Sequence, residues 1–269
     1  PRRFGKSITA AMLSAYYSKG EDTRELFHNF IISASDDFMD KMNKFDVISL
    51  DMASMTGKAG GSEYVVQYLE ENVLRELQEI YPQIEYDTKA PLSVNFAKIY
   101  NRTGAQFIVI IDEWDCLFRE YPADVKAQNA YIDFLRDLFK SDESKSFIVL
   151  AYLTGILPIK KYNSESSLNN FDEFTMVNAS PLEEYSGFTE EEVRQLCSKY
   201  QMDFNQIKRW YDGYILGDDT HIYNPKSVTD AIRRKRIANY WSGTVTYESL
   251  RDYISMNFDG LKDSIVQML

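Results

Sequence analysis

The distribution of hydrophobic residues along the chain predicts helices alternating with strands over its first two thirds. Residues 7–17 and 62–80 carry apolar side chains at helical intervals, and Gly20 and Pro82 follow as helix-ending residues. The same reasoning predicts helices over 92–100 and 127–139. Runs rich in β-branched and aromatic residues predict strands over 45–52, 107–111 and 147–153, with a weaker strand over 174–177.

Two of these runs, Phe107–Ile111 (FIVII) and Phe147–Leu153 (FIVLAYL), are continuous and apolar instead of alternating. Such runs are typical of strands buried on both faces of a parallel sheet. Strands separated by helices imply right-handed crossovers, which place helices on both faces of that sheet. The expected fold class is therefore α/β, with a parallel sheet between two layers of helices.

The pattern of predicted elements changes after Pro181. Thr189 precedes the helical run TEEEVRQLCSKY, and Glu192 three residues later completes a capping box. Short helical pieces are expected from there to Leu269, without a strand of the buried type. The expected organisation is a core domain over 1–182 and a helical appendage, or lid domain, over 183–269.

Composition narrows the class of protein. Lys plus Arg is 30 and Asp plus Glu is 41, so the net charge is 30 − 41 = −11, which argues against broad nucleic-acid coating. No run reaches the roughly 18 apolar residues of a membrane helix. Two cysteines cannot build a disulfide framework, and two histidines make a zinc site improbable. A reducing cytoplasm fits this composition best.

Candidate chemistry begins at Gly5-Lys6-Ser7, which opens the first predicted helix. Free N–H groups at a helix N-terminus attract phosphate. In a Walker A loop, Lys6 would reach the β- and γ-phosphates and the Ser7 hydroxyl would coordinate Mg²⁺. The first glycine of that motif would lie before Pro1, so we expect a fragment cut at its N-terminus. The alternative is an ordinary helix start that carries a lysine.

A Walker B pattern follows, in which β-forming residues end in Asp112-Glu113. Asp112 would lie at the carboxyl edge of the sheet, where ligands bind in open α/β folds, and would hold Mg²⁺. Glu113 would orient and deprotonate the attacking water. The alternative is a strand end with two solvated acids.

Thr154 ends the next buried run and would lie beside this edge, where it could contact the γ-phosphate or the attacking water. Alternatively it caps a turn at Gly155. Asp51 ends the strand over 45–52 and is a weaker candidate, since an aspartate there more often caps the following turn.

The two Walker-type signals reinforce each other. Lys6 and Asp112 are 112 − 6 = 106 residues apart, which leaves room for one strand and two helices between them. This spacing is typical of P-loop NTPases of the additional-strand type. Because the strand that feeds the phosphate loop would precede Pro1, we expect a sheet that lacks its first strand. We also expect a fragment of poor stability that is inactive by itself.

The ordered blocks PRRFGKS, DEWD, LTGILPI, SLNNF, GFTEEEV, WYDGY, IYNPKSV and NYWSGT resemble the AAA-ATPase-like family of predicted bacterial ATP-binding proteins. That resemblance implies a nucleotide-binding loop formed by Arg2, Arg3, Phe4, Gly5, Lys6, Ser7 and Ile8. The alternative for the two arginines is a solvated basic pair. Family members often continue into a PD-(D/E)XK nuclease-like domain, but no convincing acid cluster of that kind occurs before Leu269.

The expected function is Mg²⁺-dependent ATP binding and hydrolysis, coupled to a conformational change, a protein partner or self-association. Ser7 and Asp112 would hold the metal, Glu113 and Thr154 would act in catalysis, and no membrane contact is expected. One rival is a nucleotide-dependent regulatory module with negligible turnover. Another is an adaptor for a nucleic-acid-acting domain, which rests on the usual C-terminal domain of the family it resembles and on the basic run 233–236 (RRKR). Such a run more often lies at the C-terminal end of a helix, where cations offset the helix dipole. The aromatic block 210–214 is expected to pack in the core.

Overall fold

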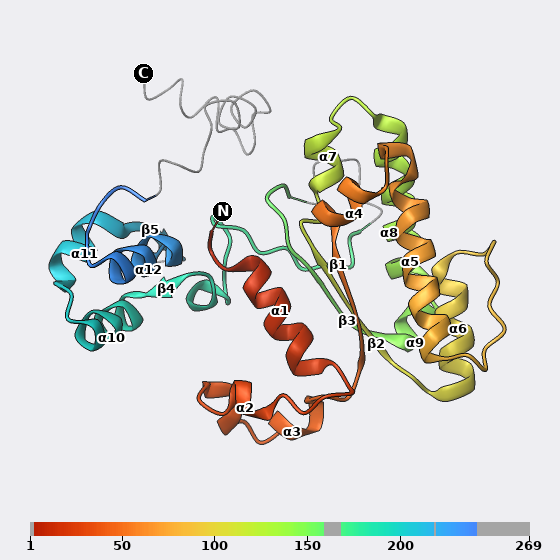
Figure 1. Cartoon of the computed structure of the whole chain (residues 1–269), viewed down its shortest axis with the longest axis horizontal. Helices are drawn as coiled ribbons and strands as arrows, with labels where there is room; N and C mark the ends of the chain where they lie inside the picture. Colours follow the sequence, from red (N-terminus) through yellow and green to blue (C-terminus); the bar gives the residue numbers. More distant parts are fainter. Residues whose placement is uncertain (1–2, 159–167, 218, 241–269) are drawn as a thin grey trace. The chain divides into compact units, whose positions relative to one another are not determined.

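The computed structural model of this chain describes residues 3–158, 168–217 and 219–240. The chain divides into two compact units, Gly5–Glu173 on the one hand and Pro1–Phe4 with Phe174–Leu269 on the other. The division at residues 173 and 174 comes earlier than the expected boundary at 182. We call them the sheet unit and the C-terminal unit (Figure 1).

The sheet unit contains three strands, β1 (Asp46–Asp51), β2 (Phe107–Asp112) and β3 (Ile148–Leu153). Its helices are α1 (Lys6–Tyr17), α2 (Arg24–Phe27), α3 (Phe38–Lys41), α4 (Met52–Lys58), α5 (Val65–Ile80), α6 (Leu92–Thr103), α7 (Cys116–Glu120), α8 (Val125–Lys140) and α9 (Ser144–Phe147), with 3₁₀ turns η1 (Ile31–Ala34) and η2 (Ser62–Tyr64).

The three strands form a parallel sheet in the order β1-β2-β3. Helix α1 covers one face, and α5, α6 and α8 lie on the other (Figure 1). The predicted parallel α/β sheet with helices on both faces is therefore confirmed. The strand register aligns Asp51 with Asp112 and Ile111 with Leu153, so the carboxyl ends of the strands meet at one edge.

Strand β2 is the centre of this unit, and its side chains from Phe107 to Ile111 are at most 1% exposed. Ile108 and Ile110 pack with Ala10 of α1. On the opposite face, the Phe107 ring lies 4.8 Å from that of Phe96 in α6, centroid to centroid. Burying each of these apolar side chains stabilises the fold by about 1.5–3 kcal/mol. Because strand side chains alternate, Asp112 shares the α1 face with Ile108 and Ile110.

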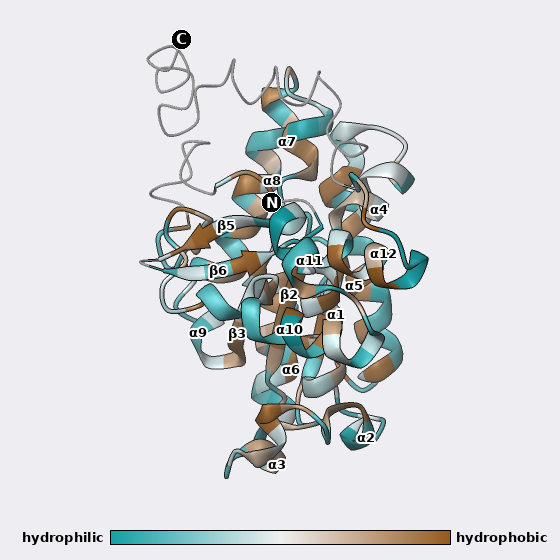
Figure 2. Cartoon of the chain, turned by 90° about the vertical axis from the view of Figure 1, so that its left-hand side faces the viewer, coloured by the Kyte–Doolittle hydropathy of each residue, from teal (hydrophilic) through white to brown (hydrophobic). Residues whose placement is uncertain are grey.

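Strand β3 differs from the expectation that it is fully buried. Val149 is 43% exposed and Leu150 is 36% exposed. Within the described residues β3 pairs with β2 alone and forms an edge of the sheet, so part of its apolar run faces solvent. Amphipathic packing is clearer in the helices, since α5 and α8 carry both hydrophobic and hydrophilic residues (Figure 2).

The C-terminal unit contains strands β4 (Phe188–Thr189), β5 (Asp212–Leu216) and β6 (Thr220–Tyr223), helices α10 (Glu190–Tyr200), α11 (Phe204–Tyr211) and α12 (Pro225–Arg234), and the 3₁₀ turn η4 (Glu183–Tyr185). Its strands form an antiparallel sheet in the order β4-β6-β5. The expectation of a purely helical appendage is therefore wrong. The strand predicted over 174–177 is also wrong, because only an isolated bridge joins Thr175 and Asn178 there.

These strands are hard to find in the sequence because they are short and mix polar with apolar residues. The signal that would have found β5 and β6 is the run YIL followed by Gly217, a turn residue, and then THIY. Gly217 adopts φ +58° at that turn, a conformation that favours glycine. The predicted capping box is confirmed, since the Glu192 side chain accepts the Thr189 N–H at 2.8 Å.

The basic run 233–236 lies where the helix-end interpretation places it. Helix α12 ends at Arg234, and Lys235 adopts φ +50° as its C-cap. Arg233 pairs with Asp230 at 3.1 Å, and the Lys235 ammonium donates to the Tyr200 carbonyl. In the aromatic block, Tyr211 is buried and its hydroxyl donates to the Ala238 carbonyl at 2.8 Å, whereas Trp210 is 46% exposed.

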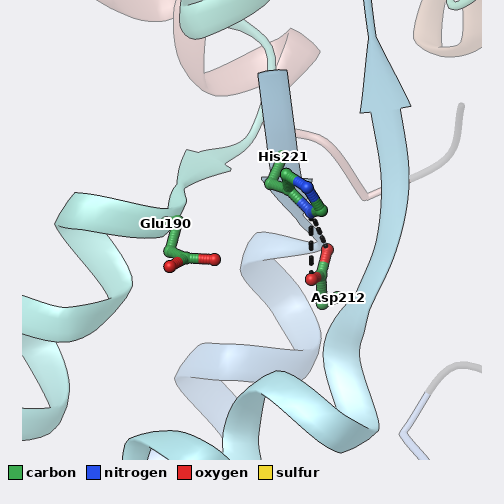
Figure 3. Close-up of side chains that lie close together, drawn as sticks. All are labelled: Glu190, Asp212 and His221. Carbon is green, nitrogen blue, oxygen red and sulfur yellow. Dashed lines mark hydrogen bonds and ion pairs between the residues drawn. The ribbon is translucent and has the colours of Figure 1, made fainter. Parts of the chain in front are cut away.

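A polar cluster joins α10, α11, β5 and β6 in this unit. Glu190, Asp212 and His221 approach one another with donor atoms within 4.8 Å, and His221 Nδ1 lies 3.0 Å from the Asp212 carboxylate (Figure 3). The Lys208 ammonium already lies 2.6 Å from Glu190 Oε2 and 4.0 Å from Asp212 Oδ2. Since a cation from the chain neutralises these acids, the cluster is an ion-pair network of the fold.

Two further findings concern membrane-spanning helices and the cysteines. Among the described helices, none combines the length and apolar character that crossing a bilayer requires. Cys116 and Cys197 are both free and buried.

The His221–Asp212 pair predicts a pH-dependent contribution to stability. Hydrogen bonding to Asp212 raises the pKa of His221 above its ordinary value near 6.5. When the pKa of a group is higher in the folded than in the unfolded state, the pair stabilises the fold fully at pH values below the unfolded-state pKa. That stabilisation is lost as pH rises through the folded-state pKa. An NMR titration of the imidazole signals should give His221 a pKa above 6.5. The Asp212→Asn substitution should lower that pKa. An unchanged titration in Asp212→Asn would contradict the assignment.

Candidate functional site

The N-terminus of α1 presents backbone donors without a side-chain cap. Gly5 is the N-cap residue at φ +87°, a left-handed conformation that glycine adopts without strain, and no side chain caps the helix. The first N–H groups of a helix have no partner within it, and the helix dipole adds positive potential there. Ser7 is exposed, and Ile8 is 67% exposed.

The two acids Asp112 and Glu113 follow at the carboxyl end of β2. The Glu113 N–H donates to Asp112 Oδ1 at 3.0 Å. Glu113 itself has φ +53°, a left-handed conformation that few residues with a side chain adopt. Such strain persists where surrounding contacts determine it, and it is concentrated at functional sites.

Thr154 lies directly beside Asp112. Its hydroxyl donates its proton to Asp112 Oδ1 and not to the turn at Gly155. Its backbone is fixed on both sides, because the Thr154 N–H donates to the Ile111 carbonyl at 2.8 Å and the Thr154 carbonyl accepts the Trp114 N–H at 2.9 Å. The side chain is 4% exposed.

Asp51 has the capping role that the sequence favours for it. Its Oδ1 accepts the Ser54 N–H at 3.1 Å and caps α4. Although Asp51 aligns with Asp112 in the sheet, one of its oxygens is thus engaged by the following helix.

Lys6 lies in the electric field of the acids at the end of β2. Burial lowers the pKa of the Lys6 ammonium, while the nearby carboxylates of Glu113, Asp112 and Asp115 oppose that shift. The structure therefore brings together Lys6 from α1, Asp112 and Glu113 from the end of β2, and Thr154 from the end of β3. All four belong to the sheet unit.

Arg119 and Asp115 complete this group and were not identified from the sequence. The Arg119 guanidinium forms an ion pair with the Glu113 carboxylate. Its Nε lies 3.2 Å from Asp115 Oδ2, close enough for an ion pair although poorly aligned for a hydrogen bond. Asp115 is fully buried, and its Oδ2 accepts the N–H groups of Ile156 at 3.1 Å and Leu157 at 2.8 Å. The spacing of Asp115 and Arg119, four apart across a helix start, is the signal that would have indicated the pair.

The other predicted loop residues fall elsewhere. Arg2 lies outside the described residues. Arg3 and Phe4 belong to the C-terminal unit. Arg3 is exposed with φ +68°, whereas the Phe4 side chain is buried with Ala179, Leu216 and Ile222.

A parallel α/β sheet flanked by helices, with a glycine at the N-cap position of its first helix, is consistent with a P-loop-like fold. The comparison with family models agrees with this class. The family model AAA-ATPase_like, described as a predicted AAA-ATPase, matches residues 1–163. The match covers 163 of the 269 residues. The chain belongs to the AAA-ATPase-like family. A search of curated proteins found no match to this chain.

Gly155, in the loop after β3, has no room for a side chain. A Cβ there would lie 2.5 Å from Trp114 Cδ1 and 2.9 Å from Asp115 Oδ1, and Trp114 is buried. We expect Gly155→Ala to lower the free energy of unfolding by about 1–3 kcal/mol, as overpacking does. Urea unfolding measures this change.

Gly57 in α4 provides the matched control for that substitution. A Cβ there has no atom within 4 Å, so Gly57→Ala should raise the unfolding free energy by about 0.5–1 kcal/mol. A Gly155→Ala variant as stable as the unmodified chain would show that the loop moves to admit a methyl group.

Proposed function

We propose that this protein binds ATP with Mg²⁺ and hydrolyses it, as a P-loop hydrolase whose nucleotide state alters its conformation or a partner contact. One observation carries the proposal: α1, which begins at Lys6 without a side-chain cap, packs on the face of the buried strand β2 that ends in Asp112. The carboxylates of Asp112 and Glu113 act on the Lys6 ammonium there. A cation and backbone N–H donors on one side, with acids on the other, suit a phosphate with its metal.

The phosphates would be held by the start of α1. The amides after Gly5 supply N–H donors, and Lys6 supplies a positive charge at the β- and γ-phosphates. A phosphate group near Lys6 favours its charged form, which offsets the effect of burial on its pKa. Arg2, Arg3, Phe4 and Ile8 remain in the proposal as loop residues on the strength of the family resemblance.

The metal would be held by Ser7 and Asp112. Mg²⁺ prefers oxygen ligands, one or two from the protein, and retains several waters. The exposed Ser7 hydroxyl and the Asp112 carboxylate are ligands of that kind, and Asp112 Oδ1 is already oriented by the Glu113 N–H and the Thr154 hydroxyl. When bound, Mg²⁺ neutralises charge on the transferring phosphate.

The chemical step would depend on Glu113 and Thr154. Glu113 would accept the proton of the attacking water, and Thr154 would contact that water or the γ-phosphate. Phosphoryl transfer needs little covalent assistance, so these side chains act mainly by position and charge.

The second candidate is a nucleotide-binding regulatory module with negligible turnover. The ion pair between Glu113 and Arg119 favours it, because the guanidinium engages Glu113 Oε2, one of the two oxygens that could take the proton of an attacking water. The nucleic-acid adaptor has less support, since Arg233 and Lys235 of the basic run make contacts within the unit.

Lys6→Ala should abolish measurable ATP binding, or weaken it by at least about tenfold, because it removes the cation that faces the phosphates. Titration with a fluorescent ATP analogue in the presence of Mg²⁺ measures this, and added EDTA should weaken binding by the unmodified chain. Lys145→Ala is the control, since Lys145 is an exposed lysine paired with Asp142. Equal affinities of Lys6→Ala and the unmodified chain would refute the phosphate role of Lys6.

Glu113→Gln should retain ATP binding and slow phosphate release on the order of 10²-fold or more, because glutamine keeps the size but cannot accept the proton. Phosphate release and nucleotide titration are measured on the same samples. Glu79→Gln, on the exposed side of α5, is the matched control. Hydrolysis by Glu113→Gln at the unmodified rate would remove Glu113 from the mechanism.

A further inference from the structure

Arg119 pairs with two acids of the segment that follows β2, Glu113 and Asp115. It projects from α7 and is only 16% exposed. It contacts the carboxylates of Glu113 and Asp115, two acids that differ in how firmly they are held. Their difference decides which of the two contacts can open.

Asp115 is the fixed partner. It is fully buried and accepts two backbone N–H groups from the loop after β3 as well as facing Arg119. Burial disfavours the guanidinium charge, yet Asp115 and Glu113 raise the pKa of Arg119 above its ordinary value. Arg119 therefore stays charged, and Asp115 tethers it.

Glu113 is the releasable partner. Its side chain is 37% exposed, whereas that of Asp115 is 0% exposed. Its backbone is held at φ +53° with the N–H on Asp112, so only the side chain has freedom to move. An Arg–carboxylate contact of this kind is stronger than a neutral hydrogen bond, and here it engages Glu113 Oε2, one of the two oxygens that could accept a water proton.

We propose that Arg119 is a positioning residue that restrains Glu113 in a paired, unreactive position, so that the opening of this ion pair limits hydrolysis. The proposal rests on the proposed function of Glu113 as the base. It accounts for the pairing of the proposed base with a cation in a site where the lysine, both acids and the threonine are already together. Turnover would then report how often Glu113 leaves Arg119.

Arg119→Gln tests the restraint directly. Removing the guanidinium frees Glu113, and we expect kcat for ATP to rise roughly three- to tenfold with KM unchanged, which is the range of a partly exposed ion pair. Arg119→Lys retains a cation and should return kcat toward the unmodified value. Adding Glu113→Gln to Arg119→Gln should abolish the gain, a result that a general change in packing would not produce.

Loss of Arg119 leaves the buried Asp115 carboxylate without its cation, so folding is checked by thermal unfolding. The double variant Arg119→Met with Asp115→Asn removes both charges and keeps an oxygen acceptor for the loop N–H groups. It should show the same rise in kcat. Arg136→Gln in α8 is the matched control, since Arg136 pairs with Asp133 on an exposed surface.

The outcomes separate this inference from the proposed function. A folded Arg119 variant whose kcat is equal to or below that of the unmodified chain overturns the restraint while ATP hydrolysis stands. A gain that persists with Glu113→Gln also overturns it. Nucleotide binding without turnover in every variant overturns the restraint and leaves the regulatory module, and no nucleotide binding by the unmodified chain overturns both proposals. Turnover that appears only in the Arg119 variants supports the restraint.

Discussion

The burial of β2 between two layers of side chains is the constraint on which the site depends. With Phe107–Ile111 withdrawn from water on both faces, the strand cannot shift by one residue without exposing apolar side chains or burying Asp112. Its register with β1 and β3 is thereby fixed, and so is the edge at which Asp112 emerges. Strand parity then directs that carboxylate toward the face covered by α1.

A second set of contacts connects the strand ends through charge. Asp115 receives two N–H groups from the loop after β3 and faces Arg119, and Gly155 permits that loop to approach Trp114. The position of Thr154 is thus tied to the start of α7, and Arg119 extends the connection to Glu113. A buried aspartate with a partly buried arginine is costly to break on one side alone, because the remaining charge stays uncompensated.

Ion pairing also determines the character of the polar cluster in the C-terminal unit. Glu190, Asp212 and His221 have the donor atoms of a metal site, but the Lys208 ammonium lies among them. Arg194 adds a second cation at Glu190, at 2.6 Å. The donor set alone therefore does not identify a metal centre, because the charge balance of its neighbours decides whether an ion is needed.

The sequence determined the parts of this protein that rest on local patterns. The continuous apolar run ending in Asp112 and Glu113 indicated a central strand with acids at its tip, Thr189 and Glu192 indicated a helix start, and Gly5-Lys6-Ser7 indicated a helix that opens on a glycine. Each of these signals lies within a few neighbouring residues. Short strands such as β4, which has two residues, carry no comparable signal.

Tertiary structure decided what depends on residues far apart in the chain. The partial exposure of β3 follows from its place in the strand order, and the β4-β6-β5 sheet follows from pairing between separated segments. The contact of Thr154 with Asp112 joins residues 42 positions apart, and the tether of Asp115 to the loop after β3 spans a similar distance. Periodicity records which side of an element is apolar, whereas charge pairing across elements arises only when the packed layers bring those side chains together.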